Sequence, residues 1–140
     1  MGQRDHHLFV YGTLMSNANG ALGKTQRDRL AREGRSLGPA TLTGARLYDL
    51  GRYPGLTESG DAADIVHGEL IALDDPHITL VWIDAYEGLA PGGHDENEYA
   101  RVQRDVRLAS GGELMAWVYV LLREIAQYRP ITSGRWKGAR

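Results

Sequence analysis

The stretch His7-Leu8-Phe9-Val10-Tyr11-Gly12-Thr13-Leu14 is the part of the chain from which the fold is best interpreted. Leu8 to Tyr11 form an unbroken apolar run of strand-favouring residues, which predicts a strand buried on both faces. Gly12 has no Cβ, so the backbone there can turn sharply or lie close to a ligand. Backbone N–H groups beyond the strand end lack a sheet partner and can bind a carboxylate or a developing oxyanion. An ordinary first strand that enters a tight turn explains the same residues.

The composition predicts one globular domain over residues 1–140. The chain is 42% hydrophobic and 24% charged, and this length can bury a proper core. Its 18 glycines favour many turns and a strand-rich fold. The net charge of -2 offers no basic stripe for nucleic acid, so we expect no nucleic-acid partner.

Membrane, disulfide and metal chemistry are not expected. The sequence has no secretory signal pattern and no apolar run of the roughly 20 residues that span a bilayer. It has no cysteine, and its five histidines have no metal-ligand spacing. We therefore expect a cytoplasmic protein with no membrane partner, no metal and no cofactor.

The middle of the chain predicts a helix followed by antiparallel strands. Residues 24–34 are typical of an exposed helix ending at a glycine, and residues 40–50 and 65–73 of strands. A turn over residues 51–55 and a polar loop separate the strands. Since no helix lies between them, the strands should be antiparallel neighbours.

A second helix and a hairpin follow. Asp75-Pro76 is typical of a helix start, and the helix should run to Glu87 and stop at Gly88. Its apolar stripe is expected to comprise Ile78, Val81, Trp82 and Ala85, with Leu89 just past the stop. Residues 98–108 and 113–122 should pair across two glycines, whereas the tail over residues 128–140 shows little periodicity.

One resemblance to a phosphate-binding loop is rejected. Residues 18–25 match the pattern G-x-x-x-x-G-K-[ST] except that Ala18 replaces the first glycine. The preceding strand ends near Thr13, several residues too early for the backbone to enclose a phosphate. Asp75, which could imitate a magnesium-binding strand end, is better explained as a helix cap.

Glu87 is the strongest candidate for acid–base chemistry. In the last turn of a helix it meets the negative end of the helix dipole, which disfavours an ionised carboxylate. Its pKa should rise if the carboxyl is also desolvated, as suits a general acid or base. A solvated terminal glutamate would fit the same pattern.

Two residues of the hairpin are weaker candidates. Tyr119 could orient a substrate, although a strand tyrosine usually belongs to the core with its hydroxyl paired. Arg101 could lie near an anionic ligand or form a cross-strand ion pair. The sequence assigns no role to Arg52 or Tyr99.

Several short motifs occur together in an order that resembles the γ-glutamylcyclotransferase-like family, including the AIG2-like proteins. They are Tyr11-Gly12-Thr13-Leu14, Tyr53-Pro54-Gly55, Val66-His-Gly68-Glu69-Leu70, Asp84-x-Tyr86-Glu87-Gly88, Tyr99-x-Arg101, Ala116-x-x-Tyr119-Val120 and Ser133-Gly134-x-Trp136. These motifs cover nearly the whole chain.

The resemblance implies an α+β fold: a small, mixed, mainly antiparallel, barrel-like sheet flanked by helices. It also implies that the α-amine of a γ-glutamyl amide attacks its own γ-carbonyl, which releases 5-oxoproline and a free amine. Glu87 would be the acid–base residue, and Tyr11, Gly12, Thr13 and Leu14, with Tyr119, would bind the substrate. No cofactor is implied.

The chain departs from the family pattern in ways that leave its substrate open. Met15 occupies a place where many relatives have a basic residue. The loops over residues 15–23 and 90–97 are specific to this protein. Both loops are expected to border the pocket, so the sequence does not identify the released amine. A small-molecule binding module that has kept the pocket without turnover is one alternative, and a structural or interaction protein with no pocket chemistry is another.

Overall fold

The computed structural model describes residues 6–16, 18, 23–51, 53–87, 99–122 and 125–137. Its elements are β1 (His7–Val10), α1 (Lys24–Glu33), β2 (Gly34–Thr43), β3 (Ala45–Asp49), β4 (Pro54–Glu58), β5 (Ile65–Leu73), α2 (Pro76–Tyr86), β6 (Tyr99–Leu108), β7 (Glu113–Leu121) and β8 (Arg129–Ile131). Residues 88–98 lie outside the described residues, and with them the expected helix stop at Gly88 and the whole loop over residues 90–97. Arg52 and part of the loop over residues 15–23 also lie outside them.

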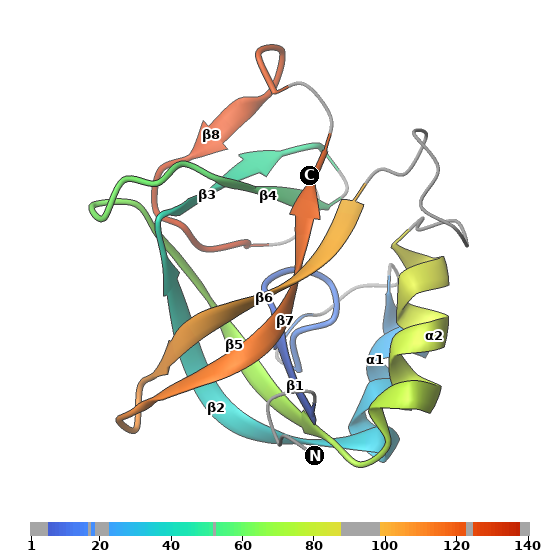
Figure 1. The fold of residues 1–140 in the computed structure, drawn as a ribbon. Helices are drawn as coiled ribbons and strands as arrows, with labels where there is room; N and C mark the ends of the chain where they lie inside the picture. Colours follow the sequence, from blue (N-terminus) through green and yellow to red (C-terminus); the bar gives the residue numbers. More distant parts are fainter. Residues whose placement is uncertain are drawn as a thin grey trace.

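Within the described residues, β1, β5, β2, β6 and β7 close into a barrel in that order (Figure 1). The neighbours are antiparallel except for β1 and β7, which run parallel where Leu8 lies opposite Trp117. β4, β3 and β8 form a separate three-stranded sheet, drawn at the top of Figure 1. Both helices lie on the same side of the barrel, beside β1 (Figure 1). The predicted α+β fold, a mainly antiparallel barrel-like sheet with flanking helices, is confirmed.

β1 is buried on both faces, as its apolar run predicts. Leu8 and Val10 belong to a core cluster that includes Leu80 of α2. Phe9, on the opposite face, packs in a second cluster with residues such as Val66 of β5. The strand therefore separates two cores, and the residues that follow it emerge between the barrel and the helices.

The strand predicted over residues 40–50 is wrong in its extent. β2 begins directly after α1, at Gly34, and ends at Thr43. A break in the strand at Gly44 separates it from β3. Gly44 has φ +78°, a left-handed conformation that a glycine adopts without steric cost. This break lets β2 stay in the barrel while β3 joins the second sheet.

The apolar stripe predicted for α2 is also wrong. Ile78 and Val81 are 55% and 70% exposed, and the buried residues of the helix are Thr79, Leu80 and Ile83. The polar Thr79 can occupy the core because its hydroxyl donates a hydrogen bond of 2.6 Å to Oε1 of Glu33. A polar pair thus replaces an apolar contact between the helices.

Other local predictions are confirmed. The Asp75 carboxylate accepts the N–H of His77 at 3.1 Å, with Pro76 at the first helical position. The strand over residues 65–73 and the β6–β7 hairpin form as expected. The short strand β8, by contrast, lies in a tail for which no element was predicted.

Candidate active site

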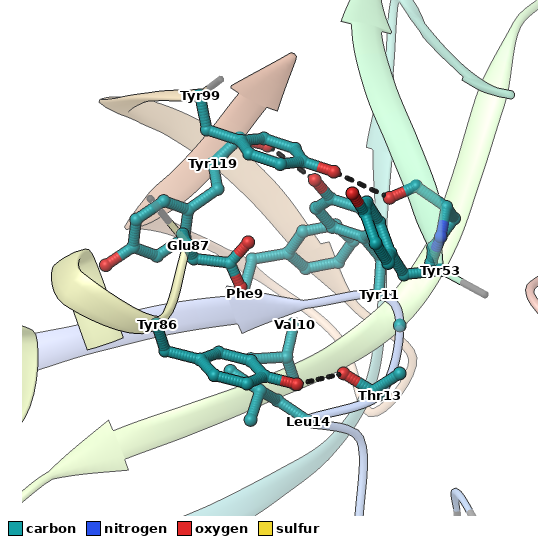
Figure 2. A pocket seen from close by; sticks show the side chains of 12 residues that line it. Phe9, Val10, Tyr11, Thr13, Leu14, Tyr53, Tyr86, Glu87, Tyr99 and Tyr119 are labelled. Atoms are coloured by element: carbon teal, nitrogen blue, oxygen red, sulfur yellow. Dashed lines mark hydrogen bonds between the residues drawn. The ribbon is translucent and has the colours of Figure 1, made fainter. Parts of the chain in front are cut away.

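A cavity of about 220 Å³ lies where β1 ends, between α2, the start of β4 and the strands β6 and β7 (Figure 2). Its walls are mainly aromatic. The lining residues are Phe9, Val10, Tyr11, Gly12, Thr13, Leu14, Tyr53, Pro54, Tyr86, Glu87, Tyr99 and Tyr119. All six residues predicted for the site therefore line one cavity, although their chemical roles remain predictions. Tyr11 to Leu14 follow β1, Glu87 follows α2 and Tyr119 lies in β7.

The residues after β1 form a turn. The Met15 N–H donates to the Gly12 carbonyl at 3.1 Å, which places Thr13 and Leu14 at the centre of the turn. Central amides of such a turn point away from its own hydrogen bond. Within the part of the chain that the structure describes, no protein acceptor receives the N–H of Thr13 or Leu14. These two amides can therefore bind an oxygen of a ligand.

Contacts on several sides hold the turn. The Thr13 hydroxyl shares a hydrogen bond of 3.0 Å with the Tyr86 hydroxyl, which Figure 2 shows at the floor of the cavity. The Thr13 carbonyl accepts a hydrogen bond from Arg27 of α1 at 3.1 Å. Leu14 is buried in the core cluster that contains the helices. The position of the amides therefore depends on both helices.

Glu87 caps the C-terminal end of α2, and its N–H donates to the Ile83 carbonyl at 2.8 Å. The residue is half-buried. Its side chain leaves the helix end and directs the carboxylate into the cavity, toward the side chains of β1 (Figure 2). Glu87 and the turn residues Gly12 to Leu14 thus line the same cavity.

Four tyrosines of the wall use their hydroxyl groups within the protein. Besides Tyr86, the hydroxyl of Tyr11 donates to the Tyr119 carbonyl at 2.7 Å, and that of Tyr99 to the Pro54 carbonyl at 3.0 Å (Figure 2). The hydroxyl of Tyr119 donates to Oδ1 of Asp84 at 2.6 Å. Mainly ring faces are therefore left to contact a ligand.

The phenols of Tyr11 and Tyr119 stay neutral at physiological pH. Burial, with smaller contributions from Tyr99 and Glu87, raises the pKa of Tyr11 well above its usual value of 10. Burial and the neighbouring Asp84 carboxylate raise the pKa of Tyr119 in the same direction. Tyr11 and Tyr119 therefore act as fixed hydrogen-bond donors. Among the described residues that line the cavity, Glu87 is the only one with a carboxyl group.

Asp84, one helical turn before Glu87, belongs to a cluster that sequence reasoning missed. Besides the Tyr119 hydroxyl, it accepts two hydrogen bonds from Arg101, at 2.8 and 3.1 Å. The guanidinium of Arg101 lies 4.3 Å from the centre of the Trp117 ring. Arg101 thus makes an ion pair between strand and helix, not the cross-strand pair considered from the sequence, and the cluster fixes the end of α2 against the barrel.

Four further residues of the cavity wall are part of the family motifs, but the sequence alone assigned them no role in the site. Tyr53, Pro54, Tyr86 and Tyr99 reach the cavity from β6 and from the ends of β4 and α2. The order of these motifs along the chain indicated the family, but it does not show that these four residues meet at one cavity. No group of three or more His, Asp or Glu side chains that could hold a metal ion occurs among the described residues.

Comparison with known proteins identifies relatives over nearly the whole chain. The family model described as "Gamma-glutamyl cyclotransferase, AIG2-like" matches residues 8–138. The γ-glutamylcyclotransferase family protein YtfP of Escherichia coli K12 is 31% identical over 129 residues, covering 92% of this chain and 94% of that protein.

Solved structures agree on the fold. The solution structure of ytfP from E. coli superposes with a TM-score of 0.62 at 31% identity and covers 94% of this chain and 96% of that one. The crystal structure of an AIG2-like protein from Mus musculus has a TM-score of 0.65 at 23% identity and covers 88% and 81%. Within the described residues, neither helix has the length and apolar character needed to cross a membrane.

Proposed function

Because this chain belongs to the γ-glutamyl cyclotransferase, AIG2-like family, we propose that it cyclises a γ-glutamyl amide and releases 5-oxoproline and a free amine. One observation carries the proposal: the Glu87 carboxylate and the Gly12–Leu14 turn line the same cavity. The proposed site needs no cofactor, and its partner is the small-molecule substrate. The cytoplasm remains the expected location.

The reaction needs one proton-transfer group. Glu87 accepts a proton from the α-ammonium group of the substrate, and the freed amine attacks the γ-carbonyl. The new C–N bond closes a five-membered ring, and the C–N bond to the leaving amine then breaks. Glu87 returns that proton to the departing nitrogen, and the second proton, which the ring nitrogen loses as the lactam forms, protonates the released amine. The position of Glu87 at the helix end and beside aromatic rings supports this role, since both features disfavour a permanently ionised carboxylate. The raised pKa expected from the sequence stays a prediction.

The turn supplies the complementary polar groups. The amides of Thr13 and Leu14 would bind the substrate carboxylate or the oxyanion that develops on the γ-carbonyl oxygen. Because the two reacting groups belong to one molecule, the protein mainly needs to hold it in a bent conformation. The ring faces of Tyr11, Tyr99 and Tyr119 suit this purpose. Tyr119 would position the substrate through its ring, since its hydroxyl is bonded to Asp84.

A 5-oxoproline assay over a panel of γ-glutamyl amines tests the proposal. The panel includes γ-glutamyl amino acids and the γ-glutamyl-lysine isopeptide. Wild-type protein should release 5-oxoproline from at least one of them. Glu87→Gln keeps the shape and removes the base, so its turnover should fall by about 100-fold or more. Equal rates in the two proteins would refute the role of Glu87.

The alternative is a binding module on the same scaffold. A thermal-shift screen with the same compounds separates the two, because a ligand that binds the native state raises the melting temperature. Stabilisation without 5-oxoproline release would favour binding alone.

A further inference from the structure

Glu69 is a buried carboxylate outside the cavity wall that contacts the loop of the proposed site. It lies on β5, is 7% exposed and pairs with Val10 of β1 in the barrel. A buried carboxylate is stable only when hydrogen-bond donors surround it. Three donors meet it here, and two of them belong to Ser16, directly after the turn.

The contacts of Ser16 are short. Its backbone N–H donates to Oε1 of Glu69 at 2.7 Å, and its hydroxyl donates to Oε2 at 2.7 Å. Bonds to an ionised acceptor are stronger than bonds between neutral groups. Since Val10 and Ser16 flank the turn, the strand pairing of Glu69 fixes the start of this segment and its side chain fixes the end.

The third donor comes from β2. The Ser36 hydroxyl donates to Oε2 of Glu69 at 2.5 Å, next to a β-bulge between Ser36 and Gly38. The Gly38 N–H in turn donates to the Ser36 hydroxyl at 3.1 Å, which orients that group. Ser36 therefore holds the carboxylate in place without touching the turn.

We propose that Glu69 is a positioning residue: through Ser16 it fixes the Gly12–Leu14 turn, and thereby sets where the Thr13 and Leu14 amides meet the substrate. This inference rests on the proposed function for its effect on turnover. Glu69 does not line the cavity and transfers no proton.

Two serine variants form a matched pair for the test. Ser16→Ala and Ser36→Ala each remove one hydroxyl that donates to the same carboxylate oxygen, but only Ser16 belongs to the loop. Ser16→Ala should lower kcat/KM by about 10-fold, whereas Ser36→Ala should stay within about 2-fold of wild type. The pH dependence of kcat should keep its shape in both variants. Equal losses in the two variants would reduce Glu69 to a structural group and overturn the proposal.

Amide hydrogen exchange gives a readout that does not depend on turnover. Exchange at Met15 and at position 16 should accelerate in Ser16→Ala and stay unchanged in Ser36→Ala, because only the first loosens the loop. If the wild-type protein turns over no γ-glutamyl amide, the proposed function fails. Even then, amide exchange at Met15 and at position 16 that accelerates only in Ser16→Ala would support the proposal that Glu69 fixes the turn. The same exchange rates in both variants would refute it.

Glu69→Gln separates positioning from acid–base chemistry. The glutamine keeps a carbonyl oxygen that can accept the Ser16 N–H, so this variant should retain far more turnover than Glu87→Gln. If Glu69→Gln is as inactive as Glu87→Gln while its melting temperature is close to that of wild type, the purely positioning role is wrong.

Discussion

Two glutamates stand at the C-terminal ends of the two helices and have different roles. Glu33, at the end of α1, accepts hydrogen bonds from Arg29, Thr79 and Trp82 at 2.6 to 2.8 Å. Burial opposes its ionisation, but these hydrogen bonds outweigh that effect and lower the pKa of Glu33 to about 2. Glu87, at the C-terminal end of α2, faces a cavity whose aromatic walls use their hydroxyls elsewhere. Glu33 therefore joins α1 to α2 through its hydrogen bonds, whereas Glu87 lines the cavity of the proposed site.

Shortening the acid should have the largest effect. Glu87→Asp keeps the charge but withdraws the carboxylate by one methylene, so kcat for 5-oxoproline release should fall by about 100-fold. Glu33→Asp is the matched control and should leave kcat within about 2-fold of wild type, since Glu33 does not line the cavity. Similar kcat values for both variants would erase the contrast between the two glutamates.

Removing the charge of Glu33 should affect stability. Glu33→Gln should lower the free energy of unfolding by about 2–3 kcal/mol at pH 7, because the native state holds the pKa of Glu33 far below its usual value. Since that pKa is lowered, the stabilisation is present above the unfolded value of 4.5 and is lost as the pH falls toward about 2. Urea unfolding of both proteins between pH 6 and pH 3 measures it. A difference that grows on acidification would contradict this account.

A methyl group in the turn should have an intermediate effect. A Cβ at Gly12 would lie 2.9 Å from Cδ and 3.0 Å from Cγ of Pro54, so either the turn or Pro54 must move. Gly12→Ala should therefore lower kcat/KM by about 10-fold while the protein stays folded. Steady-state kinetics with a thermal melt measures both quantities. Unchanged kinetics would show that the turn tolerates displacement and does not limit the reaction.

The smallest kinetic effect should come from the Tyr119 hydroxyl. Tyr119→Phe keeps the ring face and loses the bond to Asp84, so kcat/KM should stay within about 3-fold while the protein loses about 1–3 kcal/mol of stability. Steady-state kinetics and urea unfolding of the variant measure the two effects. A 10-fold rise in KM without loss of stability would instead mean that the hydroxyl contacts the substrate.

The sequence predicted elements whose signals are local. The apolar run of β1, the Asp75 cap and the glycine pair of the β6–β7 hairpin depend on near neighbours, and each forms as expected. The predicted stripe of α2 omitted Thr79 because its partner, Glu33, lies 46 residues earlier in the chain. Gly44 was missed for a related reason, since alternation around it continues across the break between two sheets.

The sequence was enough to predict which residues form the candidate site, but not how the fold brings them together. The family motifs indicated Glu87, the Tyr11–Leu14 stretch and Tyr119, and the fold brings them to one cavity. Asp84 and Glu69 were part of the same motifs, yet their roles depend on Arg101 and Ser16, which only the tertiary structure brings to them. Such positioning contacts leave no spacing rule in the sequence.

A crystal structure of the Glu87→Gln variant with a bound γ-glutamyl amide would test the central claim most directly. The account predicts the ligand in the cavity, its α-amine within about 3.5 Å of the side-chain amide that replaces the carboxylate, and one of its oxygens within about 3.2 Å of the Thr13 or Leu14 N–H. A ligand bound elsewhere, or bound with its amine turned away from position 87, would contradict it.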